Sequence, residues 1–161
     1  MKQFKKLVLP LLLMCCFLMS TLQVAAADEL LGTVVDGSVL TEEMEAETTV
    51  YPRQRGSYLS SGSGHIVLAG TGKVTISGST SAYQIVDTVK LTLYLQRLEN
   101  GQWVPVATLG PKAVYNTNYV SNSKTYSVAR GYYYRVYGGH TAIEGSKSEA
   151  LTSYTDGVWV P

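Results

Sequence analysis

The sequence predicts an all-β protein of seven or eight strands, arranged in two sheets that pack face to face. Three observations carry this prediction. Val, Ile, Thr and Tyr are frequent from residue 56 onward, and these residues favour strands. Gly and Ser interrupt them at intervals of roughly 8–12 residues, which is typical of a sandwich. No apolar repeat of helical period is present, and the chain is long enough for one domain with its own core.

The first residues predict a secretory signal peptide over residues 1–27. Lysines precede an apolar run at 7–18, and the small residues Ala25–Ala27 follow it. The alternative, an uncleaved membrane anchor, is disfavoured because the run is short for a span. We therefore expect a secreted protein with no membrane segment after processing. Cys15 and Cys16 leave with this segment, so we expect neither a disulfide nor a cysteine-based metal site.

Charge divides the remaining chain into two parts. Residues 28–50 carry seven acidic residues and no basic one, whereas residues 51–161 carry ten basic and five acidic residues. Because like charges repel and this stretch has no aromatic residue, we expect 28–54 to be a largely disordered acidic linker or pro-segment. The domain itself is predicted at 55–161. Its modest positive charge suits acidic polymers better than nucleic acid, which calls for a denser basic patch.

Eight stretches with strand-forming composition follow one another in the domain. Each is rich in β-branched or aromatic residues and is bounded by turn-forming residues. They are predicted at 64–69, 73–80, 87–98, 102–109, 113–120, 123–129, 131–143 and 148–160.

One hairpin can be registered residue by residue. Asn100-Gly101 separates two apolar runs, and both residues accept the positive φ of a type I′ turn. A two-residue loop places Leu98 opposite Trp103 and Leu95 opposite Val106. The aliphatic side of this hairpin is predicted to face the core, and it consists of Val89, Leu91, Leu93, Leu95, Val104 and Val106. The mixed side is predicted to face mostly outward, and it consists of Tyr94, Gln96, Leu98, Trp103 and Pro105.

The stretch 131–139, GYYYRVYGG, alternates in the same way. Burying an arginine without a partner is costly, so the face that carries Arg135, Tyr133 and Tyr137 is predicted to be the outer one. The opposite residues, Tyr132, Tyr134 and Val136, are predicted to face the core. Each buried tyrosine hydroxyl then needs a partner near the edge of the sheet.

The segment GYYYRVYGGHTAI resembles the tyrosine-bearing penultimate strand of fibronectin type III and related immunoglobulin-like domains. The resemblance implies an immunoglobulin-like sandwich, in which Tyr132 takes the place of the corner tyrosine and Val128 precedes the corner. It also implies that strand 131–143 lies beside strand 87–98. The tryptophan usual on an early strand has no counterpart here, because Trp103 and Trp159 both lie late in their strands.

With those two strands adjacent, the outward residues form a candidate ligand-binding face. Aromatic rings stack on sugar rings and supply contact area at low entropic cost, and Arg and Gln add hydrogen bonds. An alternative is that these rings only stabilise the sheet as cross-strand pairs. The predicted ligand-binding residues are Tyr94, Gln96, Trp103, Tyr133, Arg135 and Tyr137.

Catalytic and metal chemistry find little support in the sequence. The domain has His65 and His140 but no G-x-S-x-G motif, and the stretch SGSGH at 61–65 places Ser63 two residues from His65 with no orienting acid nearby in sequence. His140 is predicted to lie at a strand end with a backbone partner. We therefore expect no enzyme activity, no cofactor and no metal site.

The whole domain is similar to a family of small exported proteins of Gram-positive bacteria known only as a domain of unknown function. The similar features are RG-x-YL at 55–59, the Gly-rich stretch at 61–82, the LQRL-x-x-G-x-W hairpin, GYYYRV and a T-x-G-x-W ending. We expect an exported interaction module that binds a glycan, a cell-wall polymer or a surface protein, but not nucleic acid. The alternatives are a self-associating structural protein and, less favoured, a hydrolase.

Overall fold

The structure is a computed structural model that describes residues 30–53, 56 and 58–161. The predicted signal peptide, with Cys15 and Cys16, lies outside these residues, as does Arg55 at the start of the similarity to the exported family. Residues 32–161 form one structural unit. Strands account for most of this unit, so the all-β prediction is confirmed.

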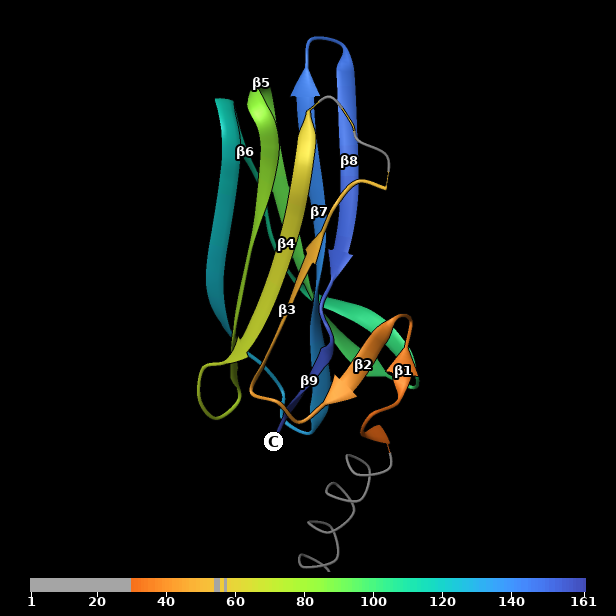
Figure 1. Cartoon of the computed structure of the whole chain (residues 1–161). Coiled ribbons are helices and arrows are strands. Elements are labelled where there is room, and N and C mark those ends of the chain that lie inside the picture. Colours follow the sequence, from red (N-terminus) through yellow and green to blue (C-terminus); the bar gives the residue numbers. More distant parts are fainter. Residues whose placement is uncertain (1–29, 54–55, 57) are drawn as a thin grey trace, which may run out of the picture. The chain divides into compact units, whose positions relative to one another are not determined.

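Nine strands make up the unit (Figure 1). Two of them are much longer than predicted, because β5 joins two predicted strands and β6 joins three. At Ser81–Val86, where a turn was expected between predicted strands, β5 passes through an irregularity in its pairing with β6 and continues. The strands are β1 Val34–Val35, β2 Ser38–Thr41, β3 Glu45–Val50, β4 Leu59–Leu68, β5 Lys73–Glu99, β6 Gln102–Ser127, β7 Tyr132–Glu144, β8 Lys147–Tyr154 and β9 Gly157–Val160.

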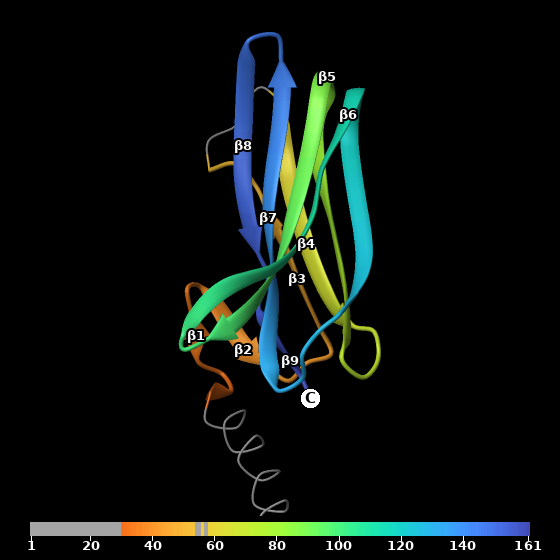
Figure 2. The ribbon, with the colours of Figure 1, turned by 180° about the vertical axis from the view of Figure 1, so that it is seen from behind.

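The strands form one curled mixed sheet and not the two separate sheets that were predicted. Its order is β1-β2-β9-β7-β5-β4-β3, with β6 paired to β5 and β8 paired to β7. The first part of β5 pairs with β4, its second part pairs with β7, and β6 runs beside both. Figures 1 and 2 show β3 and β4 on one side of the unit and β7 and β8 on the other. A single long strand thus joins two facing halves of the sheet, which enclose the core.

The prediction that the acidic segment is a disordered linker is wrong for the described residues between 32 and 53, which contain three strands. β3 pairs with β4 from Glu45 to Val50, and β2 pairs in parallel with β9. Along β3 the acidic residues Glu45 and Glu47 are exposed, whereas Ala46 and Thr48 are half-buried. The negative charges therefore stay hydrated while the backbone completes the sheet, so their repulsion does not prevent folding.

The core lies between the two halves of the sheet. The predicted aliphatic face is confirmed on β5, where Val89, Leu91, Leu93 and Leu95 are fully buried. It is wrong on β6, because Val104 and Val106 are exposed.

A bulge after a correctly predicted turn accounts for the exposure of Val106, whereas Val104 lies before the bulge and pairs with Arg97. Asn100 and Gly101 have positive φ, and Leu98 pairs with Trp103 as expected. Beyond Gln96 the register shifts, so Leu95 pairs with Ala107 and not with Val106. One extra residue on β6 breaks the simple alternation of faces.

The buried tyrosine whose hydroxyl bonds back to the preceding loop is Tyr134 and not Tyr132. Tyr134 is buried, and its hydroxyl donates a hydrogen bond of 2.8 Å to the carbonyl of Ala129, five residues earlier. Tyr132, which was predicted to face the core, is 37% exposed. Its ring lies 4.5 Å below the Arg97 guanidinium, which favours a position at the surface.

His140 is a buried polar centre within the core. It lies in the interior of β7 and not at a strand end as predicted, and it interacts with side chains as well as with the predicted backbone partner, at Ser79. Its ring nitrogens lie 2.9 Å from Thr80 Oγ1 and 2.8 Å from Ser153 Oγ. A Cβ on Gly62 would come within 2.4 Å of the imidazole, so a glycine is required opposite the ring. Burial lowers the pKa of His140 to about 4, because the charged form loses its hydration.

We predict that the free energy of unfolding falls as the pH is lowered from about 6.5 to about 4. In this interval the unfolded chain binds a proton at His140 that the folded chain does not, so stability is lost on acidification. A shift from 6.5 to about 4 corresponds to about 3 kcal/mol in total. Urea unfolding across this range measures the effect.

The imidazole can be titrated directly by NMR in a His65→Gln variant, in which His140 is the one remaining histidine of the chain. A midpoint near the ordinary histidine pKa would contradict the prediction.

Candidate functional site

The structure brings most of the predicted ligand-binding residues together. Because β5 and β7 are adjacent as expected, Tyr94 pairs with Tyr137 and Gln96 pairs with Arg135. Trp103 follows on β6 opposite Leu98. The predicted neighbourhood of these side chains is therefore correct, whereas their exposure differs from one residue to the next.

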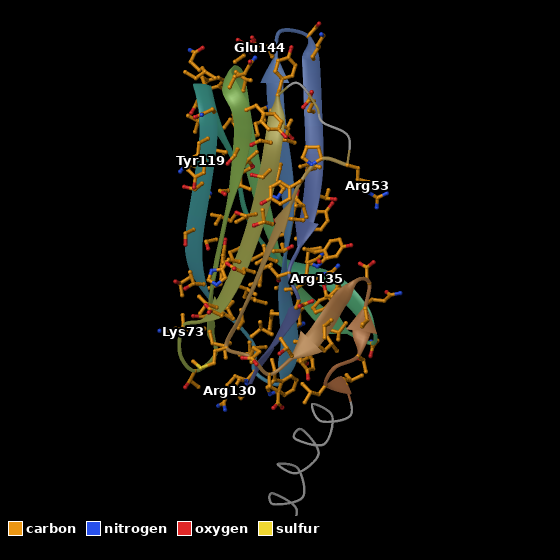
Figure 3. All side chains as sticks on the ribbon, viewed as in Figure 1. Arg53, Lys73, Tyr119, Arg130, Arg135 and Glu144 are labelled. Carbon is orange, nitrogen blue, oxygen red and sulfur yellow. The ribbon has the colours of Figure 1, made fainter. Side chains whose placement is uncertain are left out.

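Arg135 does not face solvent, as had been predicted, but is 2% exposed. Its Nε donates to Gln96 Oε1 at 2.8 Å, and its Nη1 donates to Ser38 Oγ at 2.9 Å and to the Asp36 carbonyl at 3.0 Å. Its Nη2 lies 2.8 Å from the Asp36 carboxylate. The premise that an arginine needs partners was right, but apart from Gln96 those partners come from the acidic segment. Figure 3 shows Arg135 near the β1–β2 hairpin.

The hairpin that covers Arg135 is held by its turn and by aromatic rings. Asp36 and Gly37 both have positive φ and link β1 to β2. Trp103 donates from Nε1 to the Val35 carbonyl at 3.0 Å, and its ring lies 4.6 Å from the guanidinium carbon of Arg135. The prediction of disorder overlooked the Asp-Gly pair between short apolar runs, which is a sequence signal for such a hairpin.

Tyr133 is likewise buried, which corrects its prediction as a surface residue. Its ring lies 5.0 Å from that of Trp159 on the paired strand β9. With Leu40 and Leu98 it forms a second small apolar cluster outside the main core. β2 supplies Leu40, so the segment expected to be disordered also covers this ring.

Three tyrosines on neighbouring strands remain open to solvent in part. Tyr94 on β5 pairs with Tyr137 on β7, which in turn pairs with Tyr154 on β8. The rings of Tyr94 and Tyr137 are 5.9 Å apart at a tilt of 49°. We call Tyr94, Tyr137 and Tyr154 the tyrosine row.

Tyr154 was not predicted as a site residue. The strand 148–160 was predicted without a register to its neighbours, and only the pairing with β7 places this ring beside Tyr137. Tyr154 is 43% exposed, and it also lines a hollow of about 630 Å³ with Thr152, Tyr51 and Arg53. The tyrosine row therefore ends at an open groove.

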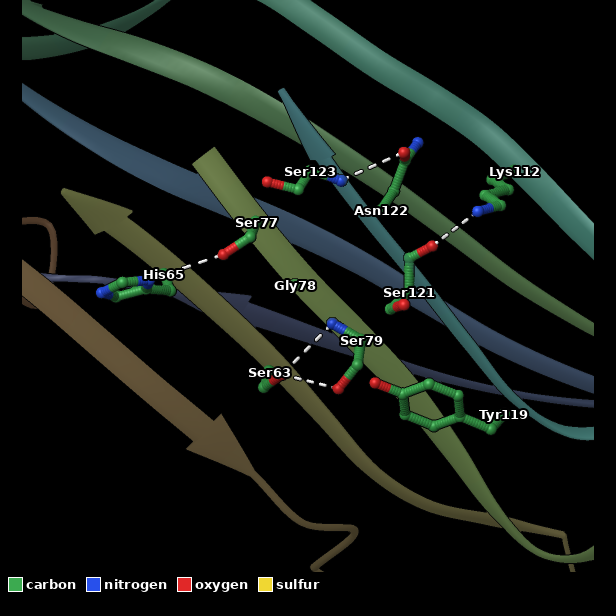
Figure 4. Close-up of a pocket in the computed structure, with 10 residues that line it drawn as sticks. All are labelled: Ser63, His65, Ser77, Gly78, Ser79, Lys112, Tyr119, Ser121, Asn122 and Ser123. Carbon is green, nitrogen blue, oxygen red and sulfur yellow. Dashed lines mark hydrogen bonds between the residues drawn. The ribbon is translucent and has the colours of Figure 1, made fainter. Parts of the chain in front are cut away.

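A second hollow, of about 510 Å³, lies on the outer side of β4, β5 and β6 (Figure 4). Half of its ten lining residues are serines. Ser63, Ser79 and Ser121 form one cross-strand row, and the residues of the next row are His65, Ser77 and Ser123. Asn122, Lys112, Tyr119 and Gly78 complete the lining. We call this feature the serine hollow.

Sequence reasoning missed the serine hollow. The signal that indicates it is the alternation of Ser and Thr over 75–81 and 121–127, which places hydroxyls on one face of each strand. That the two stretches lie side by side follows only from the pairing of β5 with β6.

A chain of three polar groups crosses one end of the serine hollow. Glu45 Oε2 lies 3.2 Å from His65 Nε2, and His65 Nδ1 lies 3.4 Å from Ser77 Oγ. An acid, an imidazole and a hydroxyl in this order form the arrangement of an orienting group, a base and a nucleophile. The sequence suggested no acid for His65, because Glu45 reaches it only through the pairing of β3 with β4.

Among the residues that the structure describes, no group of three or more His, Cys, Asp or Glu side chains is placed to hold a metal ion. In the same part of the chain, no helix has the length and apolar character that crossing a membrane requires.

Comparison with known proteins identifies the family. The profile of a family of unknown function, DUF6147, matches residues 25–157. The chain belongs to this family. No curated protein matches it. The match agrees with the expectation of a family whose domain has no assigned function, and it begins before the acidic segment, in line with the place of β1–β3 in the sheet.

Arg135→Ala is predicted to lower the free energy of unfolding by roughly 3 kcal/mol, because it removes a buried group with several hydrogen bonds. Asp36→Asn is predicted to cost less than about 1 kcal/mol, because the Asp36 side chain is 77% exposed and water screens the pair. Urea unfolding of both variants measures the two values. Equal losses would show that the ion pair, and not the burial of Arg135, dominates.

Proposed function

We propose that the protein is exported from a Gram-positive bacterium and acts there as a non-enzymatic interaction module that binds a glycan or another carbohydrate polymer of the cell surface. The observation that carries the proposal is the tyrosine row on the outer face of β5, β7 and β8. Three aligned and partly exposed rings on a rigid sheet offer a preformed apolar platform among polar groups, which suits sugar rings.

The spacing of the rings supports a polymer as the ligand. Neighbouring strands lie about 4.8 Å apart, so three strands place the outer rings of the row about 10 Å apart. An extended chain of sugar units can then contact successive rings. At Tyr154 the row meets the groove with Tyr51 and Arg53, and this arginine adds a charged hydrogen-bond donor at one end.

Arg135 and Trp103 support this site from beneath and do not touch the ligand. The guanidinium of Arg135 lies 5.3 Å from the centre of the Tyr154 ring and 4.6 Å from that of Trp103. Gly37 lies directly against Tyr154, where a Cβ would come within 2.9 Å of the ring. The β1–β2 hairpin thereby holds one end of the tyrosine row in place.

The test is a double substitution, Tyr94→Ala with Tyr137→Ala, measured on an array of bacterial surface glycans. We expect binding to weaken by about tenfold or more, because two of the three stacking rings are removed. Tyr115→Ala is the matched control, since Tyr115 is 71% exposed and pairs with Thr88, six residues along β5 from Tyr94.

Unchanged binding in the double variant, with its fold confirmed by circular dichroism, would overturn the tyrosine row as the site. Absence of binding to every glycan of the array by the unaltered protein would favour a self-associating structural role instead.

A second candidate function, ester hydrolysis, is favoured by the chain Glu45–His65–Ser77. In such a reaction Ser77 Oγ attacks the ester carbonyl while His65 Nδ1 takes the hydroxyl proton, which then passes to the departing alkoxide. Water hydrolyses the acyl-serine in the same way. We place this candidate second for two reasons: the Glu45 side chain is 67% exposed, and β5 is paired on both sides at Ser77. Its backbone donors therefore serve the sheet, and an oxyanion would rely on side chains such as Ser123.

A fluorophosphonate reagent separates the two functions. If the chain of groups is catalytic, mass spectrometry will find the label on Ser77 in the unaltered protein, and His65→Gln will lower the labelling rate by about 100-fold or more. Thr75→Ala, which removes a hydroxyl on the same face of β5 but outside the hollow, should leave Ser77 reactive. An unlabelled Ser77 would remove the hydrolase candidate and leave the binding function untouched.

A further inference from the structure

We propose that the serine hollow is a second carbohydrate-binding site, which takes a single sugar residue or a short polyol segment. It lies apart from the tyrosine row, on the outer side of the β4, β5 and β6 half of the sheet. The inner side of β4 faces β7 and β8, because Gly62 approaches His140 and Gly64 approaches Val136 and Ser153. The two sites therefore lie on opposite outer faces of the domain.

The hollow exists because small residues occupy positions where a sheet usually carries larger ones. Exposed sheet faces gain stability from cross-strand pairs of β-branched and aromatic side chains. Here two successive rows across three strands carry five serines, while Tyr119 and Lys112 stand at the rim. The sheet therefore lacks the stabilisation of large cross-strand pairs in this region. The hollow that results has a volume of about 510 Å³, which lies in the range of small-molecule sites.

Several hydroxyls of the hollow are oriented before a ligand arrives. Ser63 Oγ and Ser79 Oγ lie 2.8 Å apart, and Ser77 Oγ is directed toward His65 Nδ1. Lys112 Nζ donates to the Ser121 carbonyl at 2.8 Å, which holds the lysine against one wall. A ligand therefore meets serine side chains whose backbone positions are about 5 Å apart across the strands and roughly 7 Å apart along them, with the Ser63 and Ser79 hydroxyls drawn together into a pair.

The lining chemistry selects a polyol. A hydroxyl both donates and accepts hydrogen bonds, as do the hydroxyls of a sugar, so the two surfaces can satisfy one another in either direction. An apolar ligand finds only the half-exposed Tyr119 ring, which instead offers one stacking face for a pyranose. Lys112 is the single permanent charge of the lining, so neutral sugars are accepted and strongly anionic ligands gain only one ion pair.

The experiment follows backbone amide shifts by NMR while N-acetylglucosamine, its trimer or maltotriose is added to the full domain. We expect shifts clustered at Ser77, Ser79, Ser121 and Asn122 and little change along the tyrosine row with the single sugar. Ser79→Leu, which fills the hollow, should weaken the affinity by about tenfold or more. Thr75→Leu is the matched control, because Thr75 lies on the same face of β5 but does not line the hollow.

If Ser79→Leu does not fold, Ser121→Leu on the exposed strand β6 replaces it. The proposal is overturned if none of the three sugars shifts these amides, or if filling the hollow leaves the affinity unchanged. Shifts confined to Tyr94, Tyr137 and Tyr154 would support the tyrosine row and refute the serine hollow. The Tyr94→Ala, Tyr137→Ala protein should retain binding at the serine hollow, so the experiment tests the two proposed sites independently.

Discussion

The burial of the Arg135 guanidinium is the constraint on which the outer face of this domain depends. An arginine inside a protein must have its donors satisfied, and here the β1–β2 hairpin supplies the Asp36 carboxylate, the Asp36 carbonyl and the Ser38 hydroxyl. The same hairpin brings Leu40 onto Tyr133 and Gly37 onto Tyr154. One buried charge thus orders an acidic segment, closes a second apolar cluster and sets how much of the aromatic face meets solvent.

The long strand β5 has a comparable influence on the rest of the molecule. Since it belongs to both halves of the curled sheet, it carries part of the serine hollow near its start and part of the tyrosine row farther along. Between the facing halves lies His140, bonded to Thr80 on β5 and to Ser153 on β8. A buried polar centre of this kind joins the two halves with directional contacts, which purely aliphatic packing does not provide.

Local patterns were reliable where neighbouring residues decide the outcome. Asn100-Gly101 forms the expected turn, because the positive φ values of such a turn depend only on these two residues. The side chains from Val89 to Leu95 alternate between buried and less buried positions, as those of a strand do. The prediction failed one residue past Gln96, because a bulge on β6 exchanges Val106 for Ala107 opposite Leu95. A bulge is coupled to the twist of the sheet, and no residue of that stretch indicates it in the sequence.

The sequence by itself determined that this chain is built of strands and that Asn100-Gly101 forms a hairpin turn, and the resemblance to immunoglobulin-like domains implied that the strand with Arg135 runs beside the strand with Tyr94. Only the tertiary structure decided that the acidic segment joins the sheet, that Arg135 and Tyr133 are covered, and that Tyr154, Ser77 and Glu45 meet residues distant in the chain. The physical reason is the sequence separation over which each feature is determined. The alternation of side chains along a strand and the conformation of a turn depend on residues only a few bonds apart. Burial depends on which distant surface satisfies a charge or covers a ring, and that is settled only when the sheet closes.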